Sequence, residues 1–183
     1  MKISVEAVKE LRNRTSAGVL ECNKALLEAG GDMEKAIEFL QQRGAAIAEK
    51  KKDVAATEGV IEAYIHYTKR IGVLVELNCE TDFVAHTAEF KELAHDLAMQ
   101  IAATSPQFLT SEEMPSEAEA EAEAEAEAET EAETDPQAAC LLSQPFIKEP
   151  DKTVQEIIAE TIAKVGENIK VRRFARFELG VDR

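Results

Sequence analysis

The residue types best suited to chemistry, cysteine and histidine, are few and widely spaced in this 183-residue chain. Cys22, Cys79 and Cys140 are odd in number and form no C-x-x-C pair, so neither a disulfide framework nor a zinc site is expected. The three histidines also lack the spacing of metal ligands. We therefore expect no metal and no cofactor, and we interpret Cys22 and Cys79 as small core residues.

Motifs that would identify an enzyme are also missing. The sequence contains no P-loop, no G-x-G-x-x-G after a strand, no G-x-S-x-G and no H-E-x-x-H. The pair Gly30-Gly31 ends a helical pattern and is interpreted as a helix end, not as a phosphate loop. The 36 acidic residues allow catalytic acid–base pairs, but none of these residues stands beside a histidine in a recognisable pattern. We expect a binding protein with no catalytic residue.

The conspicuous segment is Asn78–Val84, which leaves an apolar strand and precedes a helical pattern. Two interpretations are open. Asp82 and Phe83 could be exposed together, as an anion and an apolar wedge for a partner protein. Alternatively, Asp82 caps the next helix and Phe83 tucks beneath it as a hydrophobic staple. Spacing alone favours the second interpretation.

Residues 3–44 have the spacing of three short helices. Ser4 is expected to cap the first, Gly30-Gly31 to end the second, Asp32 to cap the third and Gly44 to end it. The buried stripe of the second helix is predicted to be Val19, Cys22, Leu26 and Ala29.

The residues that follow this helical region, 46–56, form an alanine- and lysine-rich connector, which is expected to be helical or semi-flexible. Its run Lys50-Lys51-Lys52 has no interleaved aromatic residue, which favours a solvated linker over a nucleic-acid site. The net charge of −15 also disfavours direct contact with nucleic acid or with an anionic membrane. No apolar stretch of about 18 residues and no apolar leader occurs, so we expect a cytoplasmic protein.

Farther along the chain the hydrophobic period becomes two, which indicates strands. The spacing predicts strands at residues 60–66, 71–78 and 169–179 and covering helices at 90–101 and 153–165. These elements do not alternate as βαβ units would. The predicted fold class is α+β, with an N-terminal three-helix module and then a small antiparallel three-stranded sheet covered by helices. Such a small core favours support from the helical module or from a homodimer.

Between Glu117 and Asp135 lie ten acidic and no basic residues, so the rest of the chain carries a net charge of −5. Repeated Glu-Ala places like charges at i and i+4 and offers no apolar stripe, which predicts a disordered acidic linker acting as a solubilising spacer. The predicted domains are the three-helix module 1–45, the connector 46–56, the core 57–110 with 140–183, and the linker 111–139.

Three segments together resemble the elongation factor Ts family. They are Val8–Gly18, Glu76–Val84, and the C-terminal Gly166–Ile169 with Arg172–Phe174 and Arg176–Glu178. The likeness covers residues 1–110 and 144–180, roughly four fifths of the chain. Several long motifs in the same order make the resemblance specific.

The resemblance implies a guanine-nucleotide exchange factor that promotes GDP release from elongation factor Tu during translation elongation. It implies that the three-helix module is similar to a ubiquitin-associated domain and docks on the partner's nucleotide-binding domain, through Lys9, Arg12, Val19 and Leu20. It also implies a tip inserted beside the partner's magnesium and phosphate site, formed by Thr81, Asp82, Phe83 and Val84.

The chain departs from longer family members, since the Glu-Ala run stands where they carry a second core repeat and a helical protrusion. It is similar to the short members, for which the resemblance implies a homodimer. Two other functions stay open. The three-helix module would serve a non-exchange adaptor for a ribosome-associated or ubiquitin-like partner, and carboxylates near Asp82 would serve a small enzyme.

Overall fold

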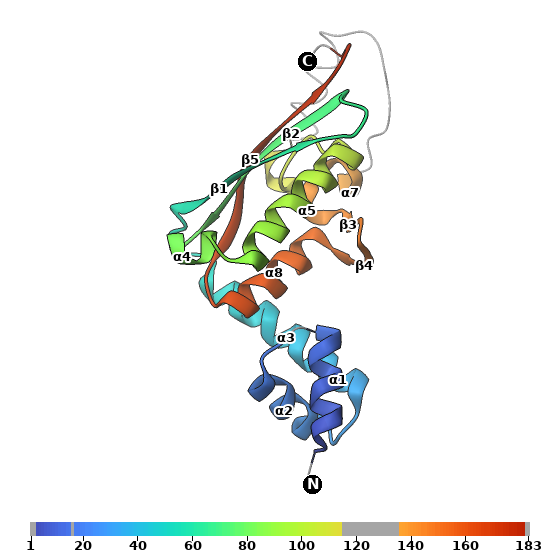
Figure 1. Ribbon diagram of the computed structural model, residues 1–183, viewed down its shortest axis with the longest axis vertical. Helices are drawn as coiled ribbons and strands as arrows, with labels where there is room; N and C mark the ends of the chain where they lie inside the picture. The colour runs from blue at the N-terminus through green and yellow to red at the C-terminus, as the bar shows by residue number, and fades with distance from the viewer. Residues whose placement is uncertain (1–2, 16, 115–135, 182–183) are drawn as a thin grey trace. The chain divides into compact units, whose positions relative to one another are not determined.

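The computed structural model describes residues 3–15, 17–114 and 136–181 (Figure 1). The chain divides into two compact units, each built from three stretches of sequence. The first comprises Met1–Gly59, Asn78–Lys91 and Ile158–Lys170. The second comprises Val60–Leu77, Glu92–Ile157 and Val171–Arg183. The Glu-Ala run lies outside the described residues, so its disorder stays a prediction, as do the four domain boundaries.

Three helices open the first unit: α1 (Val5–Thr15), α2 (Val19–Glu28) and α3 (Met33–Lys51). Local chemistry sets three of their ends as the sequence predicts. The Ser4 hydroxyl accepts the Ala7 amide at 3.1 Å, and the Asp32 carboxylate accepts two amides in the first turn of α3. Gly30 follows α2 with a φ of 64°, a conformation that favours glycine.

The core of this three-helix module is a small apolar cluster. Its buried members are Leu11, Cys22, Ala25, Leu26 and Ala36. Val19, which the spacing predicts to be inward, is instead 54% exposed. Ala17, two residues before it, packs against the cluster.

The predicted end of α3 at Gly44 is wrong, because the helix continues to Lys51. One interior glycine costs a helix only about 1 kcal/mol, and Ala45 and Ala46 next to it are good helix formers. Gly44 is buried, and a Cβ built on it would lie 3.5 Å from the Cβ of Ala163. Most of the predicted connector is therefore the last part of α3.

Three strands form one sheet in the order β1–β2–β5. They are β1 (Glu58–Ile65), β2 (Ile71–Cys79) and β5 (Ile169–Glu178). The Leu179 amide donates to the Arg70 carbonyl, so β5 runs antiparallel to β2. Alternate residues Val73, Val75 and Leu77 are buried, which confirms the predicted apolar face and, with the helices, the α+β class.

Helix α5 (Ala88–Thr104) packs on the sheet within the second unit (Figure 1). His95 of α5 contacts Glu62 of β1 at 3.0 Å. The predicted apolar stripe of α5 is buried throughout: Phe90, Leu93, Ala94, Leu97, Ala98 and Ile101. Helix α8 (Val154–Val165) begins with a capping box, in which Thr153 and Glu156 bond each other's backbone amides at 2.7 and 3.2 Å.

The segment between α5 and α8 holds elements that are too short for periodicity to reveal. They are η1 (Ser111–Glu113), α7 (Pro136–Ala139), η2 (Leu141–Ser143), β3 (Pro145–Phe146) and β4 (Glu149–Thr153), the last two paired. A buried amide pair fixes this segment, because Gln100 of α5 donates to Gln144 at 3.0 Å and accepts the Ile147 amide at 2.8 Å.

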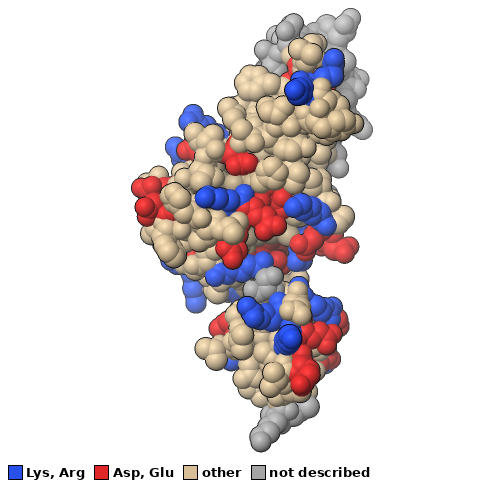
Figure 2. Space-filling view, viewed as in Figure 1, with Lys and Arg blue, Asp and Glu red and all other residues tan. Residues whose placement is uncertain are grey.

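On the face drawn in Figure 2, lysine and arginine side chains lie among aspartates and glutamates. Such interspersed charge differs from the clustered basic surface of nucleic-acid-binding proteins. Within the part of the chain that the structure describes, no helix is both long and apolar enough to cross a membrane.

Candidate functional site

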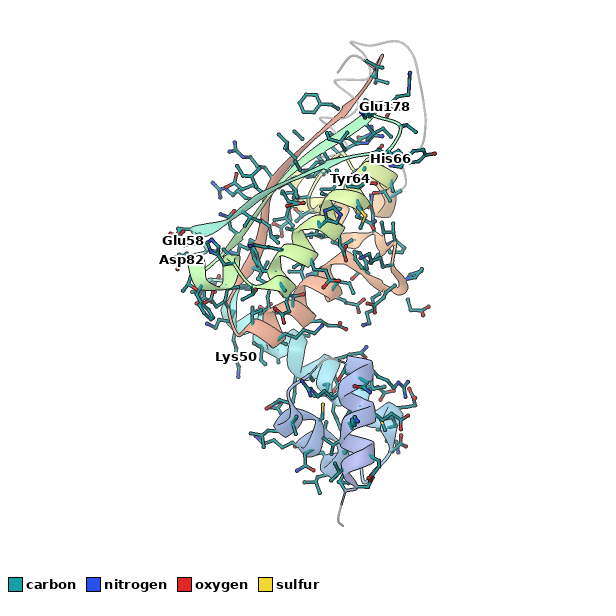
Figure 3. The ribbon with its side chains drawn as sticks, viewed as in Figure 1. Lys50, Glu58, Tyr64, His66, Asp82 and Glu178 are labelled. Carbon is teal, nitrogen blue, oxygen red and sulfur yellow. The ribbon has the colours of Figure 1, made fainter. Side chains whose placement is uncertain are left out.

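The segment that follows β2 is an exposed turn of helix. Strand β2 ends at Cys79, and α4 (Asp82–Ala85) begins shortly after it. Phe83 is 77% exposed, and Asp82 beside it is also exposed (Figure 3). The interpretation of Phe83 as a buried staple is therefore wrong. An aromatic ring and a carboxylate stand next to each other on the surface.

Thr81, not Asp82, caps α4. Thr81 has extended backbone, and its hydroxyl accepts the Val84 amide at 3.4 Å. The predicted cap is one residue too late, since Asp82 is already the first helical residue. The Asp82 carboxylate is thus not engaged in capping.

Val84 differs from its three neighbours in this segment. Its side chain is 4% exposed, and the adjacent Ala85 is buried as well. A buried side chain holds the turn in place and has no surface for a partner. Of the residues predicted to form the tip, Thr81, Asp82 and Phe83 are exposed, whereas Val84 is their anchor.

His86 also lies at this site, although no sequence pattern indicated it. Its Nδ1 donates to the Asp82 carbonyl at 2.7 Å, which holds the imidazole against the turn. A shallow, open hollow is lined by Asp82, Phe83, His86 and Thr87. Because this hollow is open to water, it does not resemble the enclosed pocket that the small-enzyme hypothesis requires.

The turn is fixed at its start by a glutamate that lies between α8 and β5. Glu167 accepts the backbone amide of Thr81 at 3.0 Å and its hydroxyl at 2.6 Å. The sequence Gly166-Glu167-Asn168 carries part of the family resemblance, but neither periodicity nor spacing predicts this contact. It joins residues 86 positions apart.

A second glutamate makes the complementary contact. Glu80 accepts the backbone amide of Asn168 at 2.6 Å and the Lys51 ammonium at 3.0 Å. The hydrogen bond from the Asn168 amide, and then Lys51, hold the pKa of Glu80 below its usual value. The buried Asn168 side chain in turn donates to the Val54 carbonyl at 2.7 Å.

The run Lys50-Lys51-Lys52, interpreted as a solvated linker, is therefore only partly so. Lys51 is the last residue of α3, and its bond to Glu80 ties that helix to the turn. Lys52 pairs locally with Glu49 and is exposed. Lys51 therefore has a structural role, although no local sequence pattern distinguishes it from the two lysines beside it.

The residues that the resemblance implies for the three-helix module are all exposed. Lys9 and Arg12 lie on α1, three residues apart and hence on one face. Val19 and Leu20 lie in the first turn of α2, and Leu20 is 75% exposed. The structure thus leaves two cations and two apolar side chains available on this module.

The cysteines are buried, as the sequence predicts for Cys22 and Cys79, and all three are free thiols. Burial raises the pKa of each thiol, which keeps these cysteines protonated and unreactive. Among the residues that the structure describes, no group of three or more histidine, cysteine or acidic side chains is arranged to hold a metal ion. The exposed turn is thus the candidate site.

Comparison with known proteins agrees with the resemblance. A sequence profile described as Elongation factor TS matches residues 3–180. The chain is 54% identical to Elongation factor Ts of Carboxydothermus hydrogenoformans, with 97% of this chain and 89% of the relative covered. It is 52% identical to the proteins of that name from Desulforamulus reducens, with 98% and 90% covered, and Heliobacterium modesticaldum, with 97% and 90% covered.

Proposed function

The chain belongs to the elongation factor Ts family, and from this premise we propose that it is a cytoplasmic exchange factor that promotes GDP release from elongation factor Tu. The tip Thr81–Val84 enters the partner beside its magnesium and phosphate site through its exposed residues Thr81, Asp82 and Phe83. The observation that carries this proposal is the exposure of Phe83, 77%, directly beside an exposed Asp82. A buried Phe83 would leave the protein without a wedge.

The chemistry of nucleotide binding explains why a small wedge suffices to weaken it. A nucleoside diphosphate is held by charge-assisted hydrogen bonds and by a magnesium ion that demands near-octahedral geometry. Displacing the elements that carry these groups weakens several bonds at once. Phe83 supplies the wedge, and Asp82 brings a negative charge near the metal shell, which makes the magnesium-bound state less favourable.

The energy available from the tip limits its role. Burial of one phenylalanine provides about 2–3 kcal/mol, or about two decades in an equilibrium constant. The tip therefore cannot drive exchange over many decades alone. Docking of the three-helix module through Lys9, Arg12, Val19 and Leu20 supplies the remaining binding energy. The coupling is reciprocal, so bound nucleotide expels this protein as well.

The test is release of a fluorescent guanine nucleotide from elongation factor Tu, with and without the chain. We expect the release rate to rise with the concentration of the chain and then to saturate. Binding to elongation factor Tu without faster release would contradict exchange and support an adaptor. A pull-down that recovers no elongation factor Tu would contradict both the partner and the mechanism.

We further propose that a second copy of the chain covers the open face of the sheet. Apolar side chains on this face are exposed, among them Ile61, Ile65, Leu74, Phe177 and Leu179 at 45–69%. The face also carries the ion pair of Arg173 with Glu76, at 2.7 Å, and two copies in opposite orientation would place these charges in complementary positions.

Light scattering should give the mass of a dimer, and Leu74→Glu should give a monomer. A monomeric native chain would contradict this proposal.

A further inference from the structure

We propose that Glu167 is a positioning residue for nucleotide exchange, acting through Thr81 to hold the tip in one conformation. This inference rests on the proposed function, because it names what keeps Phe83 in place as a wedge. The residue lies outside the tip, on the turn between α8 and β5, and the side chain reaches the tip only at its base.

The geometry is a reciprocal clasp between two dipeptides, Glu80-Thr81 and Glu167-Asn168. The Glu167 carboxylate accepts the amide of Thr81, and the Glu80 carboxylate accepts the amide of Asn168. In each dipeptide the glutamate carboxylate accepts a hydrogen bond, and the backbone amide of the next residue donates one to the other dipeptide. The exchange resembles a capping box, but it joins segments far apart in the sequence. Breaking either half would loosen the base of the tip.

The clasp controls the helical turn of the tip through the Thr81 hydroxyl. That hydroxyl has one proton, which it donates to Glu167 at 2.6 Å. Its lone pairs are then directed to accept the Val84 amide, the bond that caps α4. A chain of hydrogen bonds therefore runs from Glu167 to the first turn of α4, which includes Phe83.

The clasp is itself held to the rest of the first unit. The Lys51 ammonium donates to both carboxylate oxygens of Glu80, at 3.0 and 3.2 Å. The Asn168 side chain donates to two backbone carbonyls just after α3. Asn168 is 2% exposed, so these bonds are shielded from water. The base of the tip thus has a fixed frame.

A fixed frame matters because a wedge acts only if it does not yield. A flexible tip would bind by adopting a conformation that fits the partner, and binding energy would be spent on ordering the turn. A preorganised tip instead requires the partner to move. Loosening the clasp should therefore lower the maximum release rate more than it raises the half-saturating concentration.

The first experiment measures release of fluorescent GDP from elongation factor Tu at increasing concentrations of Glu167→Gln. Glutamine keeps the size of the side chain but offers only one oxygen for the two Thr81 donors. We expect about a 10-fold lower maximum rate, with a half-saturating concentration within about threefold of wild type. Glu92→Gln, an equal change at an exposed position of α5, is the control and should match wild type.

Thr81 variants distinguish positioning from a general loss of stability. Thr81→Val removes the hydroxyl and should slow release to a similar extent, whereas Thr81→Ser keeps the hydroxyl and should release GDP faster than Thr81→Val. The double variant Glu167→Gln with Thr81→Val should be no slower than Thr81→Val alone, because both changes break one chain of bonds. Additive losses would overturn the proposal.

A second readout needs no partner. Amide hydrogen exchange of Thr81 and Val84 in the free chain should be faster in Glu167→Gln, while amides of the three-helix module keep the wild-type rate. If wild type accelerates GDP release and Glu167→Gln does so equally, this inference fails and the proposed function stands. If wild type itself does not accelerate release, the proposed function fails, and unchanged amide exchange would then overturn the clasp separately.

Discussion

The tip and the three-helix module both expose apolar side chains, but the protein holds them in different ways. Phe83 stands on a turn whose start is fixed by the Thr81 hydroxyl, which donates to the Glu167 carboxylate and accepts the Val84 amide. Leu20 stands on α2, which has no side-chain cap at Gly18 and depends on the buried cluster beneath it. The tip adds directional polar bonds to the burial of Val84, whereas α2 is held by apolar packing.

This difference suits two tasks. Hydrogen bonds lose strength quickly when their angles change, so they define the geometry of a short turn that, in the proposed mechanism, pushes against a partner. Apolar packing is non-directional and keeps a helix in place while its outer face remains free to adapt. We therefore expect changes at the tip to affect the rate of nucleotide release, and changes at the module to affect affinity.

The largest expected effect comes from Phe83→Ala. Loss of the ring should lower the maximum rate of stimulated GDP release by about 30- to 150-fold, which corresponds to about 2–3 kcal/mol of burial. If the tip acts on the rate of release, the affinity of Phe83→Ala for elongation factor Tu should change by a smaller factor than its maximum release rate. Tyr67→Ala, which removes an aromatic side chain that is 86% exposed on the β1–β2 turn, is the control. An unchanged rate in Phe83→Ala would remove the tip from the mechanism.

A smaller effect, on the affinity for elongation factor Tu and not on the maximum rate, is expected for Leu20→Ala. Its half-saturating concentration should rise by about 10-fold, as expected for losing one partly buried leucine contact, whereas the maximum rate stays the same. Leu27→Ala provides a matched control on the same helix, since Leu27 is 48% exposed and is not a predicted contact. A fall in the maximum rate would erase the distinction between module and tip.

The two regions should also differ in their response to acid. The pKa of Glu80 is lowered in the folded protein, so its stabilising bonds are complete above the ordinary pKa of a glutamate and are lost as the pH falls through the lowered value. We expect protection of the Asn168 amide to fall in acid, while that of Leu26 in the module holds. Hydrogen exchange, corrected for its intrinsic pH dependence, measures both.

The variant Glu80→Gln isolates that response. At neutral pH it should expose the Asn168 amide about fivefold more often, from the loss of roughly 1 kcal/mol in hydrogen bonding. The fall in acid should disappear, because glutamine does not titrate. The same acid response in wild type and variant would assign it to another group.

The smallest effect concerns α3, the helix that contributes to the module and ends at Lys51. Gly44→Ala should stabilise the protein by about 0.5–1 kcal/mol, because alanine favours the helix and loses less freedom on folding. Its Cβ would make an ordinary 3.5 Å contact with Ala163. Urea unfolding measures the gain, and GDP release should not change. Destabilisation would mean that α3 cannot accept a side chain at this position.

Sequence patterns predicted most of the fold because local chemistry determines it. The cap at Asp32, the left-handed Gly30 and the capping box at Thr153 each depend on residues within a few positions. Patterns failed where a local rule competes with its surroundings. Gly44 is a poor helix former, yet flanking alanines carry the helix past it, and Thr81 takes the capping position that Asp82 also suited.

The sequence by itself determined the period of each strand and helix, the family, and the motif in which the candidate tip lies. Only the tertiary structure decided which side chains of that motif face outward. Phe83 is exposed and Val84 buried although either residue type suits a core. The contacts that hold the tip join Glu80 to Asn168 and Thr81 to Glu167 across more than 80 positions. Such contacts leave no periodic trace, because they depend on where the chain returns in space.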